Sequence, residues 1–391
     1  MNNFLYYAPT KIVFGKDREN EVGDLLKEFK AETVLVHYGG NSAVKSGLLD
    51  RVCESLKTAG LKFVTLGGVV PNPRLSKVYE GIEVCRSNNV NFILAVGGGS
   101  VIDSSKAIGY GLANEGDVWD FYEKTRFPQA SLPVGCILTI AAAGSEMSDS
   151  SVITKEDGWL KRGCNSNFCR LKFAVLNPAL TLTLPWYQVA SGAVDIIMHT
   201  IERWFDNNRT YSELTDSLAV GLVKTVMNNA LVLKKNPTDY NAAGELMWAS
   251  SLSHNGLMGC GGSTPPALIG DWSPHQLEHE LGGMFDVAHG AGLSAVWGSW
   301  ARYVCKEKPE RFAKLGKELF GEENGEVFIK KMEEFFVSID MPVTIAGLGV
   351  SVTDEQIKEL SWKCSFFGKR KVGGFRPLDV SDMEAIFRAA R

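Results

Sequence analysis

Apolar and polar residues follow two different rhythms along this chain of 391 residues. In the first half, short apolar runs alternate with segments of helical periodicity, a pattern typical of a parallel sheet with helical crossovers and ligands at the carboxyl ends of its strands. The pattern predicts strands at 4–7, 11–14, 33–37, 62–66 and 91–96, and helices at 19–30, 45–59, 74–88 and after residue 100. We expect 4–7 and 11–14 to form a strand pair around Pro9.

From about Pro178 onward, apolar residues recur at spacings of three and four, which predicts helices packed as a bundle. The predicted helices lie at 189–205, 214–233, 242–257, 275–284, 292–304 and 327–336. The change of period therefore predicts two domains, an α/β domain at 1–178 and an all-α domain at 179–391.

Composition excludes several classes of protein. A net charge of −4 and a pI near 6.0 give no electrostatic reason to bind nucleic acid. The first residues lack the features of a signal peptide, and no apolar run is long enough to cross a bilayer. The eight cysteines are scattered without a CxxC pair, as in a protein with reduced thiols. We therefore expect a cytoplasmic protein with neither nucleic-acid nor membrane partners.

Histidines and one aspartate form the most informative pattern in the chain. Asp195 and His199 are four residues apart in a predicted helix, so both side chains lie on one face. Three of the six histidines, His275, His279 and His289, follow in a second segment. A carboxylate with several imidazoles and no nearby thiolate is a donor set for a first-row divalent metal. The alternative is that these residues only line a helical bundle.

Glycine-rich turns follow two of the predicted strands. Gly98, Gly99 and Ser100 lie between a strand and a helix, with Asp103 one turn further on. Glycines allow a close approach of backbone to a pyrophosphate, and the N–H groups at a helix start favour an anion. The sequence matches neither GxGxxG nor the P-loop, so a purely structural turn remains the alternative. A second turn, Gly39-Gly40-Asn41-Ser42, favours the nucleotide interpretation.

The second turn also bears on the choice of cofactor. NAD sites usually place a carboxylate after a strand to bind the adenine-ribose hydroxyls. Residues 37–42 read HYGGNS and contain no carboxylate. A 2′-phosphate would meet backbone N–H groups and a hydroxyl there, so NADP(H) is favoured over NAD(H).

Together these motifs carry a resemblance that runs almost from end to end. They are PTKIVFG at 9–15, PNPR at 71–74, AVGGGSVIDSSKAI at 95–108, AAAGSE at 141–146, LPWYQVASGAVDIIMHTIE at 184–202 and the two histidine segments. The chain resembles the iron-containing (group III) alcohol dehydrogenases, most closely the NADPH-dependent butanol dehydrogenase and aldehyde reductase branch. The resemblance implies a Rossmann-like dinucleotide-binding domain followed by a helical catalytic domain, the architecture of dehydroquinate synthase.

The resemblance also implies roles for single residues. Asp195, His199, His275 and His289 fall on metal-ligand positions, and His279 falls on a non-ligand active-site histidine. Cofactor positions are matched by Gly39, Gly40, Ser42, Asn72, Gly98, Gly99, Ser100, Asp103, Thr139 and Lys161. Three features depart from the family pattern: Ala143 replaces a common Thr, Ser150 replaces an occasional Asn, and the loop at 260–271 with Pro265-Pro266 is unusual.

The expected reaction is reversible hydride transfer between NADP(H) and a small aldehyde or primary alcohol, with Fe(II) or Zn(II) as the Lewis acid and His279 relaying a proton. An NAD-dependent polyol dehydrogenase is the nearest alternative; it would more often carry an acidic residue near position 39. A dehydroquinate synthase-like lyase would need clustered Lys and Arg for a phosphorylated substrate, and 250–300 has none. A catalytically inactive protein that only binds a nucleotide or a metal would not need a complete set of metal ligands beside a cofactor loop.

Two weaker expectations complete the sequence interpretation. The apolar N-terminal strand pair would leave an exposed sheet edge in a monomer, which predicts a homodimer that covers it. The aromatic residues Trp159, Phe168, Trp272 and Trp300 lie near site segments in the sequence and hint at an apolar substrate pocket. His37 and His254 receive no role.

Overall fold

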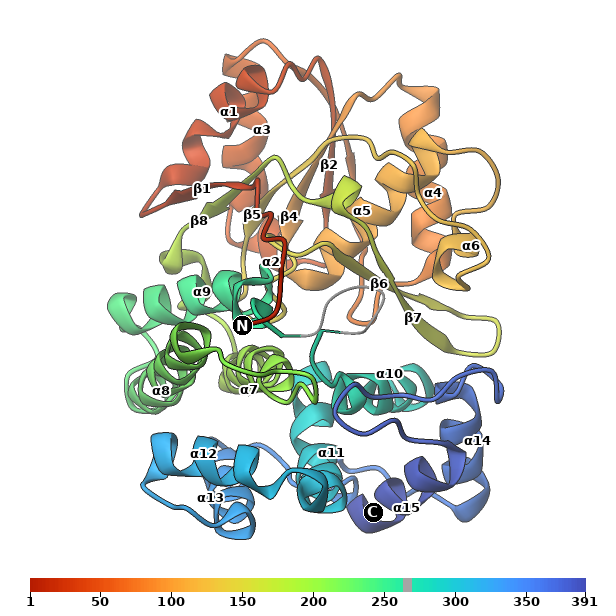
Figure 1. The fold of residues 1–391 in the computed structure, drawn as a ribbon. Coiled ribbons are helices and arrows are strands. Elements are labelled where there is room, and N and C mark those ends of the chain that lie inside the picture. Colours follow the sequence, from red (N-terminus) through yellow and green to blue (C-terminus); the bar gives the residue numbers. More distant parts are fainter. Residues whose placement is uncertain (263–268) are drawn as a thin grey trace. The chain divides into compact units, whose positions relative to one another are not determined.

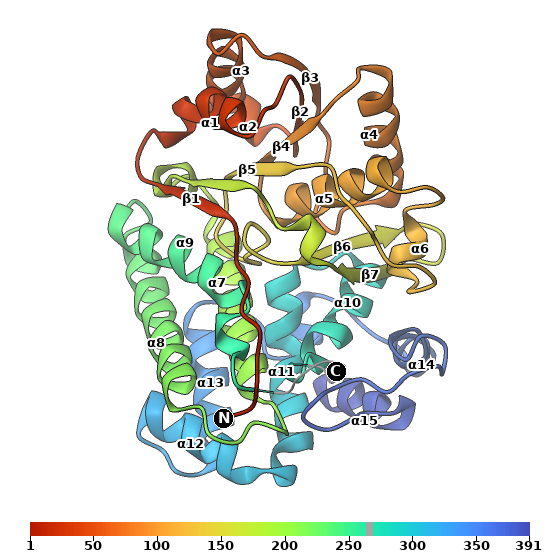
Figure 2. The same ribbon diagram turned by 45° about the horizontal axis from the view of Figure 1, so that its top comes forward.

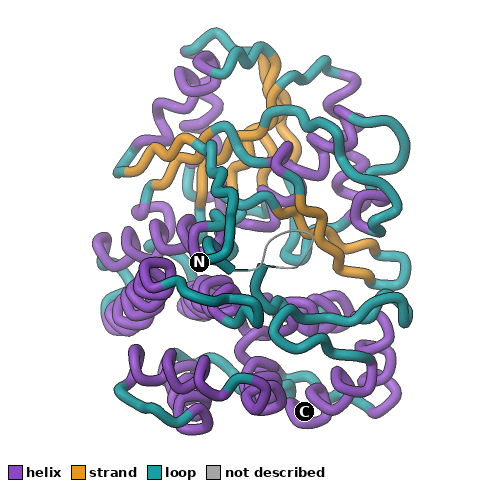
Figure 3. Tube along the Cα trace, in the orientation of Figure 1, coloured by secondary structure: helices purple, strands orange, loops and turns teal. Residues whose placement is uncertain are grey.

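The computed structural model describes residues 1–262 and 269–391. These residues form two compact units, an α/β unit at Ala8–Leu184 and a helical unit made of Met1–Tyr7 and Pro185–Arg391. The strands of the described chain, drawn in orange in Figure 3, all belong to the α/β unit. No described helix combines the length and the apolarity needed to cross a bilayer.

A six-stranded parallel sheet forms the centre of the α/β unit, with the strand order β1-β8-β5-β4-β2-β3. Its strands are β1 (Lys11–Phe14), β2 (Thr33–Tyr38), β3 (Lys62–Leu66), β4 (Phe92–Gly97), β5 (Val134–Leu138) and β8 (Phe173–Leu176). The register pairs Val34 with Phe92 and Ile93 with Val134. Because the strands are parallel, their carboxyl ends, including the two glycine turns, lie along one edge.

Helices cover both faces of this sheet. They are α1 (Val22–Glu28), α2 (Ser42–Lys45), α3 (Leu48–Thr58), α4 (Leu75–Ser87), α5 (Gly99–Ala113) and α6 (Trp119–Tyr122). Alternate residues such as Val34, Leu94 and Val175 pack against α1 and α3, whereas α5 packs on the other face (Figure 1). Strand β4 is buried throughout because helices cover both faces of the sheet, and its sequence is therefore a continuous apolar run.

A short antiparallel hairpin lies between β5 and β8 along the chain. It consists of β6 (Ser150–Lys155) and β7 (Leu160–Asn165). In Figure 2 the hairpin lies beside α5 and α6, the helices that it contacts. Polar residues interrupt the alternation of apolar and polar positions in both strands, and the sequence analysis therefore did not predict this hairpin.

The helical unit is built around α7 (Trp186–Trp204) and α11 (His289–Val304), which pack against each other. Its other helices are α8 (Glu213–Lys235), α9 (Tyr240–His254), α10 (Ser273–Phe285), α12 (Pro309–Phe320), α13 (Gly325–Ser338), α14 (Asp354–Cys364) and α15 (Val380–Ala390). Every residue of α7 from Ala190 to Trp204 is buried. Polar residues within such a helix have to be paired or to serve a function.

The parallel sheet and the helical unit confirm the predicted fold class, but one predicted element is wrong. Residues 4–7 form no strand, and β1 pairs in parallel with β8 at the sheet edge. Met1–Tyr7 belongs instead to the helical unit, where the Asn2 amide donates hydrogen bonds to the backbone oxygens of Asn208 and Gly262. The run FLYY at 4–7 is typical of a strand, but a run of apolar residues does not identify the surface on which it packs.

Candidate metal centre and nucleotide loop

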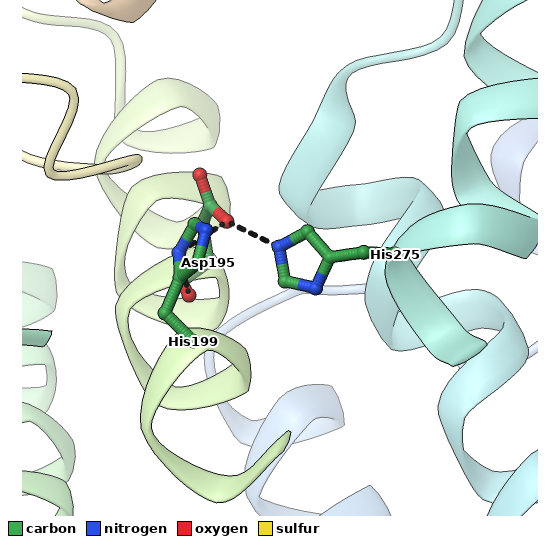
Figure 4. Close-up of side chains that lie close together, drawn as sticks. All are labelled: Asp195, His199 and His275. Atoms are coloured by element: carbon green, nitrogen blue, oxygen red, sulfur yellow. Dashed lines mark hydrogen bonds and ion pairs between the residues drawn. The ribbon is translucent and has the colours of Figure 1, made fainter. Parts of the chain in front are cut away.

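Three helices contribute the side chains of the candidate metal centre. Asp195 and His199 project from adjacent turns of α7, and His275 comes from the first turn of α10 (Figure 4). His289 is the first residue of α11. The donor atoms of Asp195, His199 and His275 all lie within 4.8 Å of one another.

A close approach between α11 and α7 brings His289 to this cluster. Gly290 follows His289, and a Cβ atom at this glycine would lie 1.9 Å from the backbone oxygen of Ser191. Any larger residue would push the start of α11 away from α7. The glycine after the histidine therefore has a packing function that serves the site.

Asp195 Oδ1 is the point at which the imidazoles converge. It lies 3.1 Å from His199 Nδ1, 3.5 Å from His275 Nε2 and 3.6 Å from His289 Nε2. Asp195 Oδ1 and His275 Nε2 are buried and make no hydrogen bond. Leaving two such polar atoms buried and unpaired is costly, and a divalent cation bound between them would remove the cost. The residues present therefore fit a metal ion.

Two buried glutamates contact the Nδ1 atoms of two of the candidate ligand imidazoles. His275 Nδ1 donates a hydrogen bond of 2.6 Å to Glu202 Oε1, and His289 Nδ1 donates to the carboxylate of Glu278. A proton on Nδ1 leaves the lone pair on Nε2, the nitrogen that faces Asp195. Carboxylate–histidine pairs of this kind are the usual support of metal-binding imidazoles.

His199 is oriented by its own helix. Its Nδ1 lies 3.0 Å from the backbone oxygen of Asp195, one turn earlier. A carbonyl oxygen only accepts, so this contact places the proton on Nδ1, the nitrogen that also lies beside Asp195 Oδ1, and leaves Nε2 as the nitrogen with a lone pair for a metal ion. The spacing of four residues thus aligns both side chains and selects the tautomer.

The pKa values of the cluster reflect its burial and its mixed charges. Burial opposes ionisation of Asp195, but the His199 and His289 imidazoles hold the pKa of this carboxyl well below its ordinary value. Burial lowers the pKa of His199 to about 3. Burial also disfavours the charged form of His275, but Glu202 outweighs it and raises the pKa of His275 to about 9. The metal-free cluster therefore holds a proton on His275 that a metal ion must displace.

His279 lies beside these donors without facing Asp195. It is buried one turn after His275, and its donor atom lies within 4.8 Å of those of Glu278 and His289. The ring centroids of His279 and His289 are 5.8 Å apart. His279 therefore lies next to the cluster of Asp195, His199, His275 and His289 without belonging to it.

Sequence reasoning gave no site role to three residues around the cluster, His254, Glu202 and Glu278, and named Trp272 only as part of an apolar pocket. The His254 ring lies 4.0 Å from the His199 ring, and the Trp272 indole contacts His199, His254 and His275. Nothing in the sequence placed His254 here, because the end of α9 meets α7 only after folding. Glu202 and Glu278 could have been found from the sequence, because each follows a candidate site histidine by three residues in a predicted helix and so lies on a neighbouring part of its surface.

The nucleotide loop is shaped by contacts that only glycine permits. α5 begins at Gly99, and the N–H groups of Val101 and Ile102 return to the Gly98 oxygen. A Cβ atom at Gly98 would lie 2.1 Å from Ile140 Cγ2. A Cβ atom at Gly99 would lie 3.2 Å from Ala143 Cβ. The segment after β5 therefore forms a wall directly against the loop.

The other predicted cofactor residues also lie at strand ends of the α/β unit. Thr139 follows β5 and donates its N–H to the Gly97 oxygen at the end of β4. Gly39 follows β2, and its oxygen accepts from the Gly68 N–H in the turn after β3. Gly40 and Ser42 are exposed in the same loop. Neighbouring strands thus bring these positions to one edge of the sheet.

Asp103, Asn72 and Lys161 are buried around the β6–β7 hairpin. Asp103 Oδ2 accepts a hydrogen bond of 2.9 Å from the Val152 N–H. Asn72 has a φ of +52° in the turn before α4, and the next residue, Pro73, accepts from the Thr154 N–H. Lys161 pairs with Thr154 across the hairpin. The Asp103 side chain thus connects α5 to the hairpin, and a backbone hydrogen bond connects the turn before α4 to it.

The aromatic residues with a suggested pocket role fall into different environments. Trp300 is fully buried in the core, whereas Trp159 and Phe168 are exposed. Only Trp272 contacts the site histidines. Pro265 and Pro266, part of the unusual loop at 260–271, lie outside the described residues.

Comparison with protein families covers both halves of the chain. Residues 9–178 match the model of the iron-containing alcohol dehydrogenases. Residues 189–391 match the C-terminal model of the Fe-containing alcohol dehydrogenase family. The matched ranges include all the candidate site residues.

Individual relatives align over nearly their whole length. The chain is 34% identical to NADH-dependent butanol dehydrogenase A of Clostridium acetobutylicum, with 99% of each chain covered. It is 30% identical to the NADPH-dependent aldehyde reductase YqhD of Escherichia coli, with 100% of each covered. The crystal structure of NADH-dependent butanol dehydrogenase A from Thermotoga maritima superposes with a TM-score of 0.95 at 34% identity, covering 100% of this chain and 99% of that one.

Proposed function

Because the chain belongs to the iron-containing alcohol dehydrogenase family, we propose that it interconverts short- to medium-chain aldehydes and primary alcohols, such as butanal and butanol, with NADP(H) as its cofactor. The family is one of alcohol dehydrogenases, and its members among the relatives include butanol dehydrogenases and an aldehyde reductase. The observation that carries the proposal is the convergence of three imidazoles on the buried Asp195 Oδ1.

We assign the metal ligands to Asp195, His199, His275 and His289, with Fe(II) or Zn(II) as the ion. When bound, the ion supplies a Lewis acid for the carbonyl oxygen of the aldehyde. Glu202 and Glu278 keep Nδ1 of two ligands protonated and so direct Nε2 inward. The neighbouring imidazoles hold the pKa of Asp195 well below its ordinary value, which favours a charged carboxylate at the site.

We assign proton transfer to His279. Its imidazole is adjacent to His289 but outside the group of donors that faces Asp195. An imidazole changes protonation state near neutral pH and can pass a proton to an alkoxide that forms as hydride is transferred.

We assign cofactor binding to the strand ends of the α/β unit, with 1–178 as the dinucleotide-binding domain and 179–391 as the metal-binding domain. The proposed cofactor residues are Gly39, Gly40, Ser42, Asn72, Gly98, Gly99, Ser100, Asp103, Thr139 and Lys161. The preference for NADP(H) is supported by the absence of a carboxylate from residues 37–42. A positive charge also lies close to this turn: Lys77 Nζ is 3.5 Å from the position of a Cβ at Gly68, whose N–H donates to the Gly39 oxygen. Lys77 also forms an ion pair with Glu80.

The test is oxidation of NADPH and of NADH by butanal, measured with chelator-stripped protein before and after addition of Fe(II) or Zn(II). We expect metal-restored activity with a lower KM for NADPH. Activity that prefers NADH would contradict the cofactor assignment and leave the metal ligands standing. Absence of activity with every metal and both cofactors would contradict the proposed function.

We also propose a homodimer. Strand β1 lies at the edge of the described sheet, and its last residue, Phe14, is 44% exposed. A second copy that covers this edge would bury apolar surface and occupy unpaired backbone groups. Light scattering should give twice the mass of one chain; a monomeric mass would contradict the proposal.

A further inference from the structure

Lys106 is a fully buried lysine in α5, seven residues after Gly99. An ammonium group in the interior is costly unless its hydrogen bonds are all satisfied, and lysine is among the residues least often buried completely. Neither the metal centre nor the assigned cofactor residues explain this burial.

The ammonium group is held by oxygen atoms from one short segment. Lys106 Nζ donates to the backbone oxygens of Ser145 and Ser150, both at 2.7 Å. It also lies 3.1 Å from the backbone oxygen and from the hydroxyl of Ser148. Among the described residues its hydrogen-bond partners are these neutral oxygens, and no carboxylate pairs with it. The lysine therefore organises the backbone of residues 145–150.

The same segment continues into the wall of the nucleotide loop. Ser145 Oγ lies 3.3 Å from the position of a Cβ at Gly99, and Ala143 Cβ lies 3.2 Å from it. One residue thus presents its backbone oxygen to Lys106 and its hydroxyl to the loop. The contact between the wall and the loop depends on where Ser145 is held.

Strand β6, which follows, has anchors of its own. Asp103 Oδ2 accepts from the Val152 N–H, and the Ser151 hydroxyl donates to the Asp103 backbone oxygen. Tyr122 adds a hydrogen bond to the Ser151 hydroxyl. Loss of Lys106 would leave these contacts in place, so its effect should concentrate on residues 145–150.

We propose that Lys106 is a positioning residue for the dinucleotide: its ammonium group fixes the turn at 145–150 so that Ala143 and Ser145 support the glycine loop at Gly98–Gly99. This proposal rests on the proposed function, because it requires the loop to bind the cofactor. It assigns Lys106 no contact with the cofactor and no part in the chemistry.

The test compares Lys106→Met with Ser105→Ala. Met fills the same space without donating, which leaves the Ser145 and Ser150 oxygens buried without their partner. Ser105 is fully buried in the same helix, but its hydroxyl donates only to Val101 of that helix. The dissociation constant of NADPH is measured by fluorescence titration of the metal-loaded enzyme, together with metal content and the thermal midpoint.

We expect Lys106→Met to weaken NADPH binding about ten- to a hundredfold, since small misplacements of a binding loop have effects of this size. Metal content should be unchanged, and Ser105→Ala should bind NADPH as the wild type does. A lower thermal midpoint with an unchanged NADPH dissociation constant would overturn the proposal. Wild-type protein that binds neither NADPH nor NADH would instead refute the proposed function.

Ser148→Ala keeps the proposal testable if Lys106→Met fails to fold. It removes one of the four acceptors and should weaken NADPH binding several-fold, in the same direction. In the double variant the two effects should not add, because both act through one hydrogen-bonded unit. Unaltered NADPH binding in Ser148→Ala, or additive effects in the double variant, would contradict the role of Lys106.

Discussion

The candidate metal centre of the helical unit and the candidate nucleotide loop of the α/β unit are built in different ways. The metal centre is a set of side chains, in which Asp195 Oδ1 faces three imidazole nitrogens at 3.1 to 3.6 Å. The nucleotide loop consists of backbone, and its shape depends on glycines that touch Ile140 and Ala143. Substitutions should therefore separate metal binding from cofactor binding.

The largest effect is expected at the point of convergence. Asp195→Asn removes the charge that faces the imidazoles, so metal content should fall and kcat should decrease about a thousandfold. Metal analysis and initial rates measure the two effects. Asp216→Asn is the matched control, a buried carboxylate of the same unit that pairs with Arg311 and Lys314. It should lose stability and keep its metal; equal metal content in both variants would contradict the ligand assignment.

The second prediction concerns the pH dependence of stability, which we attribute to His37 in β2 of the α/β unit. Burial lowers the pKa of His37 to about 4, from 6.5. In the unfolded chain His37 is protonated below about pH 6.5, whereas in the folded protein it stays neutral down to about pH 4. The unfolded state therefore binds more protons between these values, and the free energy of unfolding should fall by about 3 kcal/mol as the pH drops from 6.5 to 4. Denaturant titrations at pH 7 and pH 4.5 should show this loss in the wild type.

The control for this prediction is His37→Asn, which removes the titrating group. The His37 ring bridges the Leu66 oxygen and the Ser104 hydroxyl, so the variant should be less stable at pH 7. Its stability should nevertheless depend less on pH than that of the wild type. The same pH dependence in both proteins would show that His37 does not cause it.

The shape of the nucleotide loop can be tested with one methyl group. Gly98→Ala places a Cβ 2.1 Å from Ile140 Cγ2, which forces the wall and the loop apart. Overpacking of this kind costs about 1–3 kcal/mol, so NADPH should bind about ten- to a hundredfold more weakly while metal content stays unchanged. In Gly163→Ala the new Cβ would lie 3.7 Å from Val152 Cγ2 and 3.9 Å from the Ser151 oxygen, which are ordinary contacts, so both properties should be unaltered. Reduced metal content in Gly98→Ala would contradict the view that metal binding and cofactor binding depend on different parts of the molecule.

The smallest effect concerns the support of the ligands. Glu202→Gln retains an acceptor for His275 Nδ1 but removes the charge, so metal affinity should fall about tenfold. Competition with a chromogenic chelator measures this change. Glu333→Gln, which breaks a pair with Arg302 in the same unit, is the control and should bind metal normally. An unchanged affinity in Glu202→Gln would leave the glutamate with a packing role only.

The helices of both units could be predicted well because apolar spacing reports directly which face is buried. The predicted strand at 62–66 coincides with β3, and the predicted helix at 74–88 with α4. The predicted strand at 11–14 coincides with β1, but its predicted partner at 4–7 forms no strand, because apolar residues near a terminus can pack on any surface. The β6–β7 hairpin was missed because its polar residues, such as Lys161 and Arg162, are buried by packing that leaves no alternation.

The sequence by itself determined which side chains were available: a spacing of four for Asp195 and His199, and glycines after the strands. These follow from helix and strand geometry, which is local. The tertiary structure decided that Asp195 faces His275 and His289, that His254 lies against His199, and that Lys106 reaches Ser145. Such contacts join residues far apart in the chain, and the packing of helices and loops, rather than any local periodicity, sets their distances.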